Sequence, residues 1–256
     1  MEKAEATIVT SSGMNAIVAT LLAVVPPGGH TTFVDLDDME ALQSVLDQGN
    51  VTMFYADSLT NPHLKCVDVR RVAELCHQRG ALVCIDSTLA SPINQKPLTL
   101  GADVVLHSHH QVHRRPPRPY MIIRGLKTMA LRVEAQNRTA LQVARLLERH
   151  PKVERVNYPP WHGVARRQMT GAGGVISFEV ASDMRGAMRF VDALELPFIA
   201  TSLGECESLV QQPAIMGKSD AEKAENGIKD NLVRFSFGIE KFEDLKDDIL
   251  QALEKI

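Results

Sequence analysis

The sequence predicts an α/β fold with a mainly parallel sheet and helices on both faces, followed by a smaller C-terminal α/β domain. The runs ALVCID (81–86) and ADVVLHS (102–108) are short, apolar and rich in β-branched residues, which is typical of strands buried on both faces of a parallel sheet. Such runs alternate with amphipathic segments, as βαβ units require. We therefore expect a large domain over residues 1–125 and a small domain over residues 126–256, entered by a long helix.

Composition narrows the class of protein. The chain has 256 residues, 45% of them apolar, so it can bury a large core. A net charge of −3 argues against general nucleic-acid binding, and no apolar run is long enough to span a bilayer. The stretch MEKAEATIVTSS resembles neither a secretion signal nor a transit peptide, so the chain as written is expected in the cytoplasm. The four cysteines form no CxxC pair and lie in apolar or helical contexts, so they are expected to be reduced core thiols, with disulfides as the alternative.

The first unit of the chain reads as a strand in ATIVT (6–10), a Ser-Ser-Gly-Met turn and a helix that ends before Pro26. A glycine turn into a helix leaves free backbone N–H groups at the positive end of the helix dipole. Gly13 and Met14 are therefore candidates for binding a phosphate. A tight turn without a ligand would use the same residues.

The next strand, VTMFYAD (51–57), ends in a loop that contains Asn61 and Pro62, and we expect Tyr55 within the strand to fill core. VDVRRVAELCHQRG (67–80) has apolar residues at helical spacing and a closing glycine. A right-handed crossover then leads into the strand that ends at Asp86.

Ligands of open α/β sheets bind at the carboxyl ends of the strands, which makes Asp86, Thr88 and Ser108 candidate site residues. In the C-terminal half, Arg234 lies in the apolar strand LVRFSFG (232–238) and needs an anion. A ligand carboxylate is the first candidate, and an internal acid is the alternative.

Four histidines lie close together at positions 107, 109, 110 and 113. Imidazoles bind transition metals, but adjacent side chains of a strand point to opposite faces and no acid or cysteine follows nearby. We expect no metal site. The arginines and prolines that follow predict an extended linker.

The stretch CIDSTLASPINQKPLTLGADVVLHS (84–108) resembles the cofactor-binding strands of the pyridoxal-phosphate (PLP) enzymes of cysteine and methionine metabolism, most closely the cystathionine γ-synthases of plants. The resemblance implies the PLP-transferase fold, fold type I. It also implies that Asp86 pairs with the protonated ring nitrogen of PLP. Thr88 would lie in the same cofactor site, and Ser108 and the amides of Gly13 and Met14 would bind the cofactor phosphate.

Three further residues match motifs of that family. Asn61 corresponds to an asparagine that binds the cofactor ring oxygen and the substrate carboxylate, although a plain Asn-Pro turn is the alternative. Ser202 lies in a Ser-Leu-Gly loop of the family. Arg234 corresponds to the arginine whose fork holds the substrate α-carboxylate.

The chain also departs from the family. Where relatives have Ser-Ala-Thr-Lys, this chain has Ser108-His109-His110-Gln111, so Gln111 occupies the position of the Schiff-base lysine. A long segment between this strand and Tyr120 is missing, and so are a strand and helix that carry a stacking tyrosine before residue 31. We therefore expect no catalytic residue and at best noncovalent binding of PLP.

In relatives, the reaction is a γ-replacement that joins cysteine to an activated homoserine ester on the way to methionine. The first hypothesis, which we favour, is a truncated and catalytically impaired cystathionine γ-synthase homologue. The second is an enzyme that uses PLP without the lysine or complements an intact relative. The third is a non-enzymatic interaction or regulatory partner that forms homo- or hetero-oligomers with family members.

Overall fold

The computed structural model describes residues 4–108, 118–217 and 219–256, which divide into two compact units. Unit 1 comprises Met1–Thr60, Lys65–Arg124 and Gly163–Thr170, and unit 2 comprises Asn61–Leu64, Gly125–His162 and Gly171–Ile256. The units interleave along the chain, whereas the sequence led us to expect one boundary after residue 125. None of the helices in the described residues combines the length and apolar character needed to cross a membrane.

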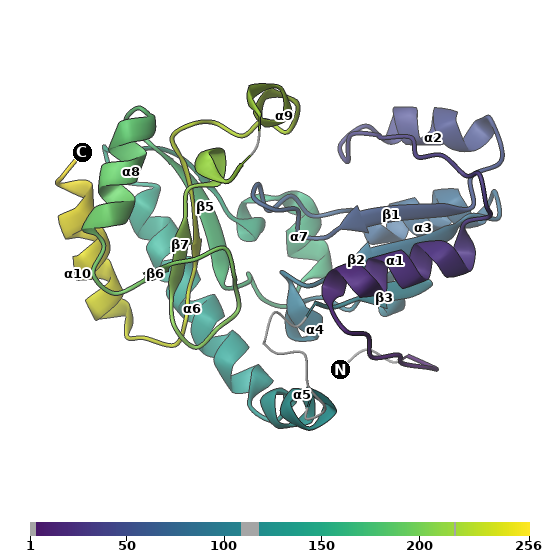
Figure 1. Cartoon of the computed structure of the whole chain (residues 1–256), viewed down its shortest axis with the longest axis horizontal. Coiled ribbons are helices and arrows are strands. Elements are labelled where there is room, and N and C mark those ends of the chain that lie inside the picture. The colour runs from purple at the N-terminus through teal and green to yellow at the C-terminus, as the bar shows by residue number, and fades with distance from the viewer. Residues whose placement is uncertain (1–3, 109–117, 218) are drawn as a thin grey trace. The chain divides into compact units, whose positions relative to one another are not determined.

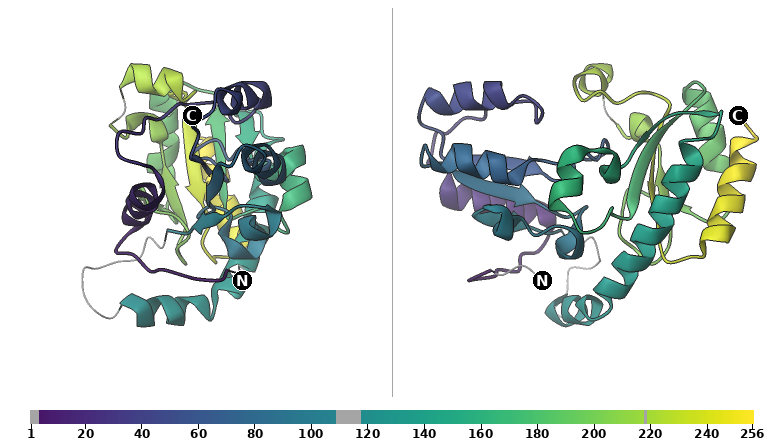
Figure 2. Two further views of the ribbon diagram at one scale, coloured as in Figure 1. Left: turned by 90° about the vertical axis from the view of Figure 1, so that its right-hand side faces the viewer. Right: turned by 180° about the vertical axis from the view of Figure 1, so that it is seen from behind.

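Unit 1 is built on a parallel sheet whose strands, within the described residues, have the order β1-β2-β3. Helix α1 lies on one face of this sheet and α3 on the other (Figures 1 and 2). The elements of unit 1 are α1 (Gly13–Val24), α2 (Met39–Asp47), β1 (Met53–Asp57), α3 (Val69–His77), β2 (Leu82–Asp86), α4 (Ser91–Asn94), the 3-10 helix η1 (Pro97–Leu100), β3 (Val104–Leu106) and α7 (Gly163–Gln168). Helix α5 (Arg118–Leu126) leads from unit 1 into unit 2. The predicted parallel sheet with helices on both faces is confirmed.

The sequence explains why β2 and α3 form the centre of unit 1. Val83, Cys84 and Ile85 of β2 are fully buried, as expected for a strand covered on both faces. Helix α3 turns its apolar residues toward the sheet, and Asp68 caps its first turn by accepting a hydrogen bond from the Arg71 backbone N–H at 3.3 Å. The Asp68 cap therefore fixes where α3 begins, and burial of the apolar residues fixes which face of α3 packs on the sheet.

The expected strand over residues 6–10 is wrong. This segment pairs with no described strand and is largely exposed. Its β-branched residues favour an extended backbone, but a strand also needs a neighbouring edge to satisfy its backbone N–H and C=O groups. Helix α1 begins at Gly13 as expected and is capped by Ser12, although none of its side chains is buried.

Unit 2 is built on a second sheet, whose described strands have the order β4-β5-β8-β7-β6. Its strands are antiparallel except for β6 and β7, which run parallel. Helices α6, α8 and α10 share one core with this sheet. The elements are α6 (Met129–Leu147), β4 (Val153–Asn157), η2 (Pro159–Trp161), β5 (Val175–Val180), α8 (Met184–Ala193), β6 (Phe198–Ile199), β7 (Leu209–Gln211), η3 (Pro213–Ile215), α9 (Asp220–Glu225), β8 (Leu232–Ser236) and α10 (Phe242–Leu253).

Apolar and polar side chains alternate along β5 and β8, so the sheet of unit 2 has one apolar face and one polar face. Phe178 and Phe235 point into the helix-covered core, where Phe178 packs edge-on against Phe190 of α8 with ring centroids 5.7 Å apart. Ser177 and Arg234, one residue away on each strand, are directly paired partners on the opposite face. The polar side chains of this sheet are therefore held on the face that the helices leave free.

Candidate functional site

Three of the predicted cofactor residues lie together at the carboxyl ends of the strands in unit 1. The Thr88 backbone N–H donates to Asp86 Oδ1 at 2.9 Å, and the Ser108 backbone N–H donates to Thr88 Oγ1 at 2.8 Å. A continuous set of hydrogen bonds therefore joins the end of β2 to the end of β3. We call Gly13, Asp86, Thr88 and Ser108 the strand-end cluster.

Gly13 joins this cluster by direct contact. A Cβ added at Gly13 would lie 2.6 Å from Ser108 Cβ and closer still to the Ser108 hydroxyl, so the approach of α1 to β3 requires glycine. In the described part of the chain, neither Gly13 nor Met14 finds an acceptor for its backbone N–H. Two free amides at the start of a 12-residue helix, beside a serine hydroxyl, fit a phosphate group.

Asp86 is suited to hold a protonated ring nitrogen. Its Oδ1 accepts from Thr88, whereas Oδ2 takes no hydrogen bond from the described residues. A carboxylate that is fixed by one oxygen and open at the other can accept a charge-assisted hydrogen bond from a ring N–H. The residues of the strand-end cluster therefore fit PLP at both its phosphate and its ring nitrogen.

Sequence reasoning missed Asp57, which is paired with Asp86 in the β1–β2 register. Desolvation raises the pKa of Asp57, the negative charge of Asp86 raises it further, and a hydrogen bond from Tyr55 opposes both. The Tyr55 hydroxyl donates to Asp57 Oδ1 at 3.1 Å. Tyr55 is thus half-buried and hydrogen-bonded, not the core residue that we expected. The i, i+2 spacing that places both residues on one strand face was the available signal.

A buried polar network, also missed, supports the loops after β1 and β2. Ser58 and Ser87 are fully buried, and both hydroxyls donate to Gln95 Oε1, at 3.1 and 3.4 Å. The Gln95 amide donates in turn to Cys66 Sγ at 3.6 Å. Buried polar groups fix geometry only when each finds a partner, and no local pattern in the sequence reveals a network formed across such separations.

The predicted substrate residues lie together in unit 2. Arg234 of β8 is only 3% exposed. Its Nη1 donates to Asn61 Oδ1 at 3.3 Å, and its Nη2 donates to the backbone oxygens of Thr201 at 2.8 Å and Ser202 at 3.0 Å. Asn61 is therefore part of the arginine site, and Ser202 contacts Arg234 through its carbonyl while its hydroxyl donates to Glu205 Oε1 at 3.4 Å.

The electrostatics of Arg234 suit an anionic ligand. Its three hydrogen-bond acceptors are neutral oxygens, and none of the ion pairs among the described residues includes it. Its Nε is buried and unpartnered, and burial lowers the pKa of the guanidinium to about 10. No carboxylate of the described residues therefore pairs with Arg234, as the alternative of an internal acid would require.

The remaining predictions concern Gln111, the four histidines and the cysteines. Gln111, which the sequence predicts at the position of the Schiff-base lysine, lies outside the described residues, as do His109, His110 and His113. Within the described residues, no group of three or more His, Cys, Asp or Glu side chains could hold a metal ion. All four cysteines are free thiols, but only Cys76 and Cys84 are buried; Cys66 is partly buried and Cys206 is exposed, so the expectation that all four lie in the core is wrong for Cys206.

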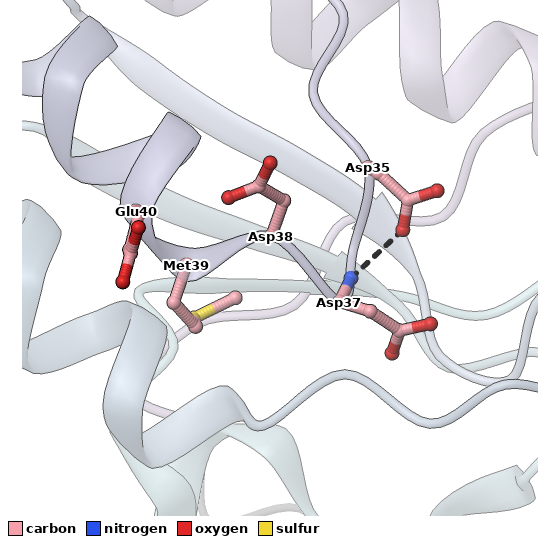
Figure 3. Close-up of a pocket in the computed structure, with 5 residues that line it drawn as sticks. All are labelled: Asp35, Asp37, Asp38, Met39 and Glu40. Atoms are coloured by element: carbon pink, nitrogen blue, oxygen red, sulfur yellow. Dashed lines mark hydrogen bonds between the residues drawn. The ribbon is translucent and has the colours of Figure 1, made fainter.

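An acidic hollow at the start of α2, shown in Figure 3, contains none of the predicted residues. Its carboxylates have local roles: Asp38 Oδ1 caps α2 by accepting from the Ala41 backbone N–H at 2.8 Å, and Asp35 Oδ1 accepts from the Asp37 backbone N–H at 2.9 Å. Asp37 also pairs with Lys65 at 2.5 Å. We assign this hollow to helix capping.

Comparison with known proteins links these features to one family. The sequence profile described as "Cys/Met metabolism PLP-dependent enzyme" matches residues 28–111 and 113–254. Over its full length, the chain is 46% identical to cystathionine gamma-synthase 1 of Nicotiana tabacum and 44% identical to that of Arabidopsis thaliana, of which it covers 59% and 57%. The chain thus spans less than two thirds of the length of these relatives. The solved structure of apo CalE6, a methionine gamma lyase from Micromonospora echinospora, matches 95% of this chain and 80% of that one with a TM-score of 0.85 and 33% identity.

The alignments also locate gaps inside the chain. The alignment with the tobacco protein extends over 320 positions and the chain has 256 residues, so at least 64 positions fall opposite interior gaps. The two blocks of the family profile are separated at Val112. At least these 64 positions of the tobacco protein therefore belong to interior segments that this chain lacks.

Proposed function

Because the chain belongs to the family of Cys/Met metabolism PLP-dependent enzymes, we propose that it is a cystathionine γ-synthase-like protein that binds PLP noncovalently and has lost γ-replacement activity. PLP is the cofactor of this family. The observation that carries the proposal for this chain is the contact between Gly13 and Ser108, beside two free amides at the start of α1. That arrangement is a phosphate cradle that an added side chain would fill.

Each residue of the strand-end cluster has a role in this proposal. The amides of Gly13 and Met14 and the Ser108 hydroxyl bind the phosphate, and Asp86 accepts the ring N–H through its free oxygen. Thr88 fixes both neighbours, because its N–H donates to Asp86 and its hydroxyl accepts from Ser108. When bound, PLP supplies an electron sink for carbanion chemistry.

The loss of activity is inferred from Gln111. An amide nitrogen is neither a nucleophile nor a base near neutral pH, so Gln111 can neither hold the cofactor covalently nor move protons at the substrate carbons, as a lysine amine can. The interior gaps, of at least 64 positions, add to the defect. Catalytic groups that act as a unit are strongly non-additive, so we expect no rescue from a single replacement.

Arg234 gives the protein its proposed amino-acid specificity. A forked guanidinium with only neutral internal partners is suited to a substrate α-carboxylate, and Asn61 beside it adds a second polar contact. Cysteine and an activated homoserine ester are the amino acids that this proposal assigns to the site.

The test uses the parent chain and the Gln111→Lys variant, each with excess PLP, cysteine and O-phosphohomoserine, followed by mass detection of cystathionine. We expect a PLP absorbance change on binding, no product from either protein, and no PLP adduct on the parent chain after borohydride reduction. Product from the parent chain, or a borohydride-trapped adduct on it, would show that another lysine acts in this protein. Product from Gln111→Lys alone would show that the rest of the site is intact.

A second candidate function is that of an interaction partner of intact family members. It is favoured by α1, a helix without charged residues whose side chains Met14 and Leu22 are 67% and 80% exposed. Size-exclusion chromatography with light scattering, on this chain alone and mixed with the tobacco relative, tests it. A mixed complex supports the partner role, and independent elution of the two proteins contradicts it.

A further inference from the structure

The two backbone oxygens that hold Arg234 Nη2 belong to a partly exposed loop. This loop, residues 200–208, joins β6 to β7, and we call it the β6–β7 loop (Figure 1). Thr201 is exposed and Ser202 is half-buried, yet their carbonyl oxygens lie 2.8 and 3.0 Å from Nη2. Two acceptors on one nitrogen use both of its hydrogens and fix the plane of the guanidinium. The conformation of the loop therefore decides where the remaining N–H groups of Arg234 point.

Ser236 holds this loop from the strand that carries Arg234. Its hydroxyl accepts a hydrogen bond from the Gly204 backbone N–H at 3.1 Å. Ser236 is 2% exposed and lies two residues after Arg234 in β8, so both side chains are on the same face of the sheet. Gly204 has a φ of 77°, a left-handed conformation that strains other residues. One face of β8 therefore carries both the guanidinium and an anchor of the loop that orients it.

Gln136 of α6 holds the next residue of the loop. Its Nε2 donates to the Glu205 backbone oxygen at 2.9 Å, and the side chain is only 6% exposed. Gly174 makes room for this side chain, since a Cβ added there would lie 2.8 Å from Gln136 Cβ. The other buried side chains of α6 are mostly apolar, and a buried amide among them costs free energy unless it is hydrogen-bonded. The bond to Glu205 accounts for the presence of an amide at this position.

Glu240 anchors the end of the loop with both of its carboxylate oxygens. Its Oε1 accepts from the Ser208 backbone N–H at 2.5 Å, and its Oε2 accepts from the Ser208 hydroxyl at 2.9 Å. None of the ion pairs among the described residues includes Glu240. This acid therefore fixes the loop and leaves the charge of Arg234 uncompensated.

We propose that Ser236 and Gln136 are positioning residues for the carboxylate site. By fixing Gly204 and Glu205, they keep the carbonyl groups of the loop on Arg234 Nη2, so that the guanidinium presents its remaining N–H groups to a ligand carboxylate. Neither residue needs to contact the ligand itself. The inference rests on the proposed carboxylate role of Arg234, and it adds the residues that set the selectivity for a carboxylate over a neutral amide.

The first measurement is an NMR titration of the full chain with L-methionine and with L-methioninamide. Methioninamide lacks the carboxylate, so the ratio of the two affinities reports on recognition of that group. Ser236→Ala and Gln136→Met each remove one anchor with little change in volume. Each should lower the affinity for methionine by about fivefold, as expected for the loss of one hydrogen bond, and leave the affinity for methioninamide within about twofold of the parent.

The second measurement needs no ligand and therefore separates this inference from the proposed function. In the chain labelled with 15N-arginine, an Nη2 group bonded to two carbonyls rotates slowly about its bond to Cζ and gives separate proton resonances. Arg234→Lys identifies these resonances by their absence. Ser236→Ala should broaden or merge them, and Gln136→Met supplies the same measurement from a second anchor should Ser236→Ala not fold.

Ser219→Ala is the matched control in the same unit. The Ser219 hydroxyl also accepts a hydrogen bond from a backbone N–H, that of Glu222 at 3.3 Å, but it caps α9. Its loss should lower Tm without changing the ratio of the two affinities or the Arg234 resonances.

Unchanged Arg234 resonances in both anchor variants, or the same change in Ser219→Ala, would overturn the inference. So would an unchanged ratio of affinities in both variants when the parent distinguishes the two ligands. A parent that binds methionine and methioninamide equally would contradict the proposed function instead, and the Arg234 resonances would still decide whether the two anchors position the guanidinium.

Discussion

An added amino acid with a free α-carboxylate should stabilise the folded protein against unfolding, and the effect should depend on Arg234. Burial lowers the pKa of Arg234 to about 10, and at about 1.36 kcal/mol per pKa unit the charged form costs the folded state on the order of 3 kcal/mol. Because the folded pKa lies below the unfolded one, this cost is present at every pH below about 10 and is relieved only as the pH rises through that value. Near neutrality, only a bound anion can offset it.

The assay is thermal unfolding with L-methionine, compared with L-methioninamide, which has the same side chain but no carboxylate. If Kd is about 5 mM, a ligand concentration of about 50 mM stabilises the folded state by roughly 1.4 kcal/mol. For a chain of this size, that free energy corresponds to a rise in Tm of about 3–6 °C. The rise should be constant between about pH 6 and 8, because Arg234 stays charged over that range.

Arg234→Lys should lose most of this rise, because an ammonium keeps the charge but not the forked geometry. Arg155→Lys, at an exposed position of β4 in the same sheet, is the matched control and should retain it. The reasoning is refuted if methioninamide stabilises as strongly as methionine, or if Arg234→Lys keeps the full rise.

Three further predictions concern unit 1 and the cysteines. Gly13→Ala should weaken PLP binding by at least about tenfold in an absorbance titration, because the added methyl would lie 2.6 Å from Ser108 Cβ, whereas Gly125→Ala, with no atom within 4 Å, should have no effect. Asp57→Asn should slightly raise the free energy of unfolding in urea at neutral pH, since the raised pKa shows that the folded state favours the neutral acid; the gain should vanish below about pH 4, and a gain that grows as the pH falls would contradict this. With a thiol reagent, Cys206 should react rapidly and the other three cysteines slowly, because burial raises the pKa of each of them; equal rates for all four would be the contrary result.

The parallel sheet of unit 1 could be predicted because its strands are marked by composition alone. Buried β-branched runs such as 81–86 leave few alternatives, and the end of each run identifies the edge where polar residues gather. The prediction of a strand over residues 6–10 was wrong because composition alone does not decide whether a segment pairs. Its composition favours an extended backbone, but pairing depends on a neighbour elsewhere in the chain, and local sequence carries no information about that neighbour.

The residues of the strand-end cluster could be predicted singly, whereas the bonds between them could not. Asp86 ends one strand and Ser108 follows the next, so their placement at one edge follows from topology. The role of Thr88 as donor to one and acceptor from the other depends on side-chain geometry. The same holds for Gln95, which joins two serines that are 37 and 8 residues away in the chain.

What compensates the charge of Arg234 could not be decided from the sequence alone. An arginine within an apolar strand requires compensation for its charge, and the sequence alone favours a ligand carboxylate but leaves an internal acid as the alternative. The structure supplies three neutral oxygens, an unpartnered Nε and no carboxylate within the described residues. Neutral acceptors bind the two terminal nitrogens of this guanidinium but leave its charge uncompensated, so burial lowers its pKa. The charge of Arg234 is therefore held available for an anion.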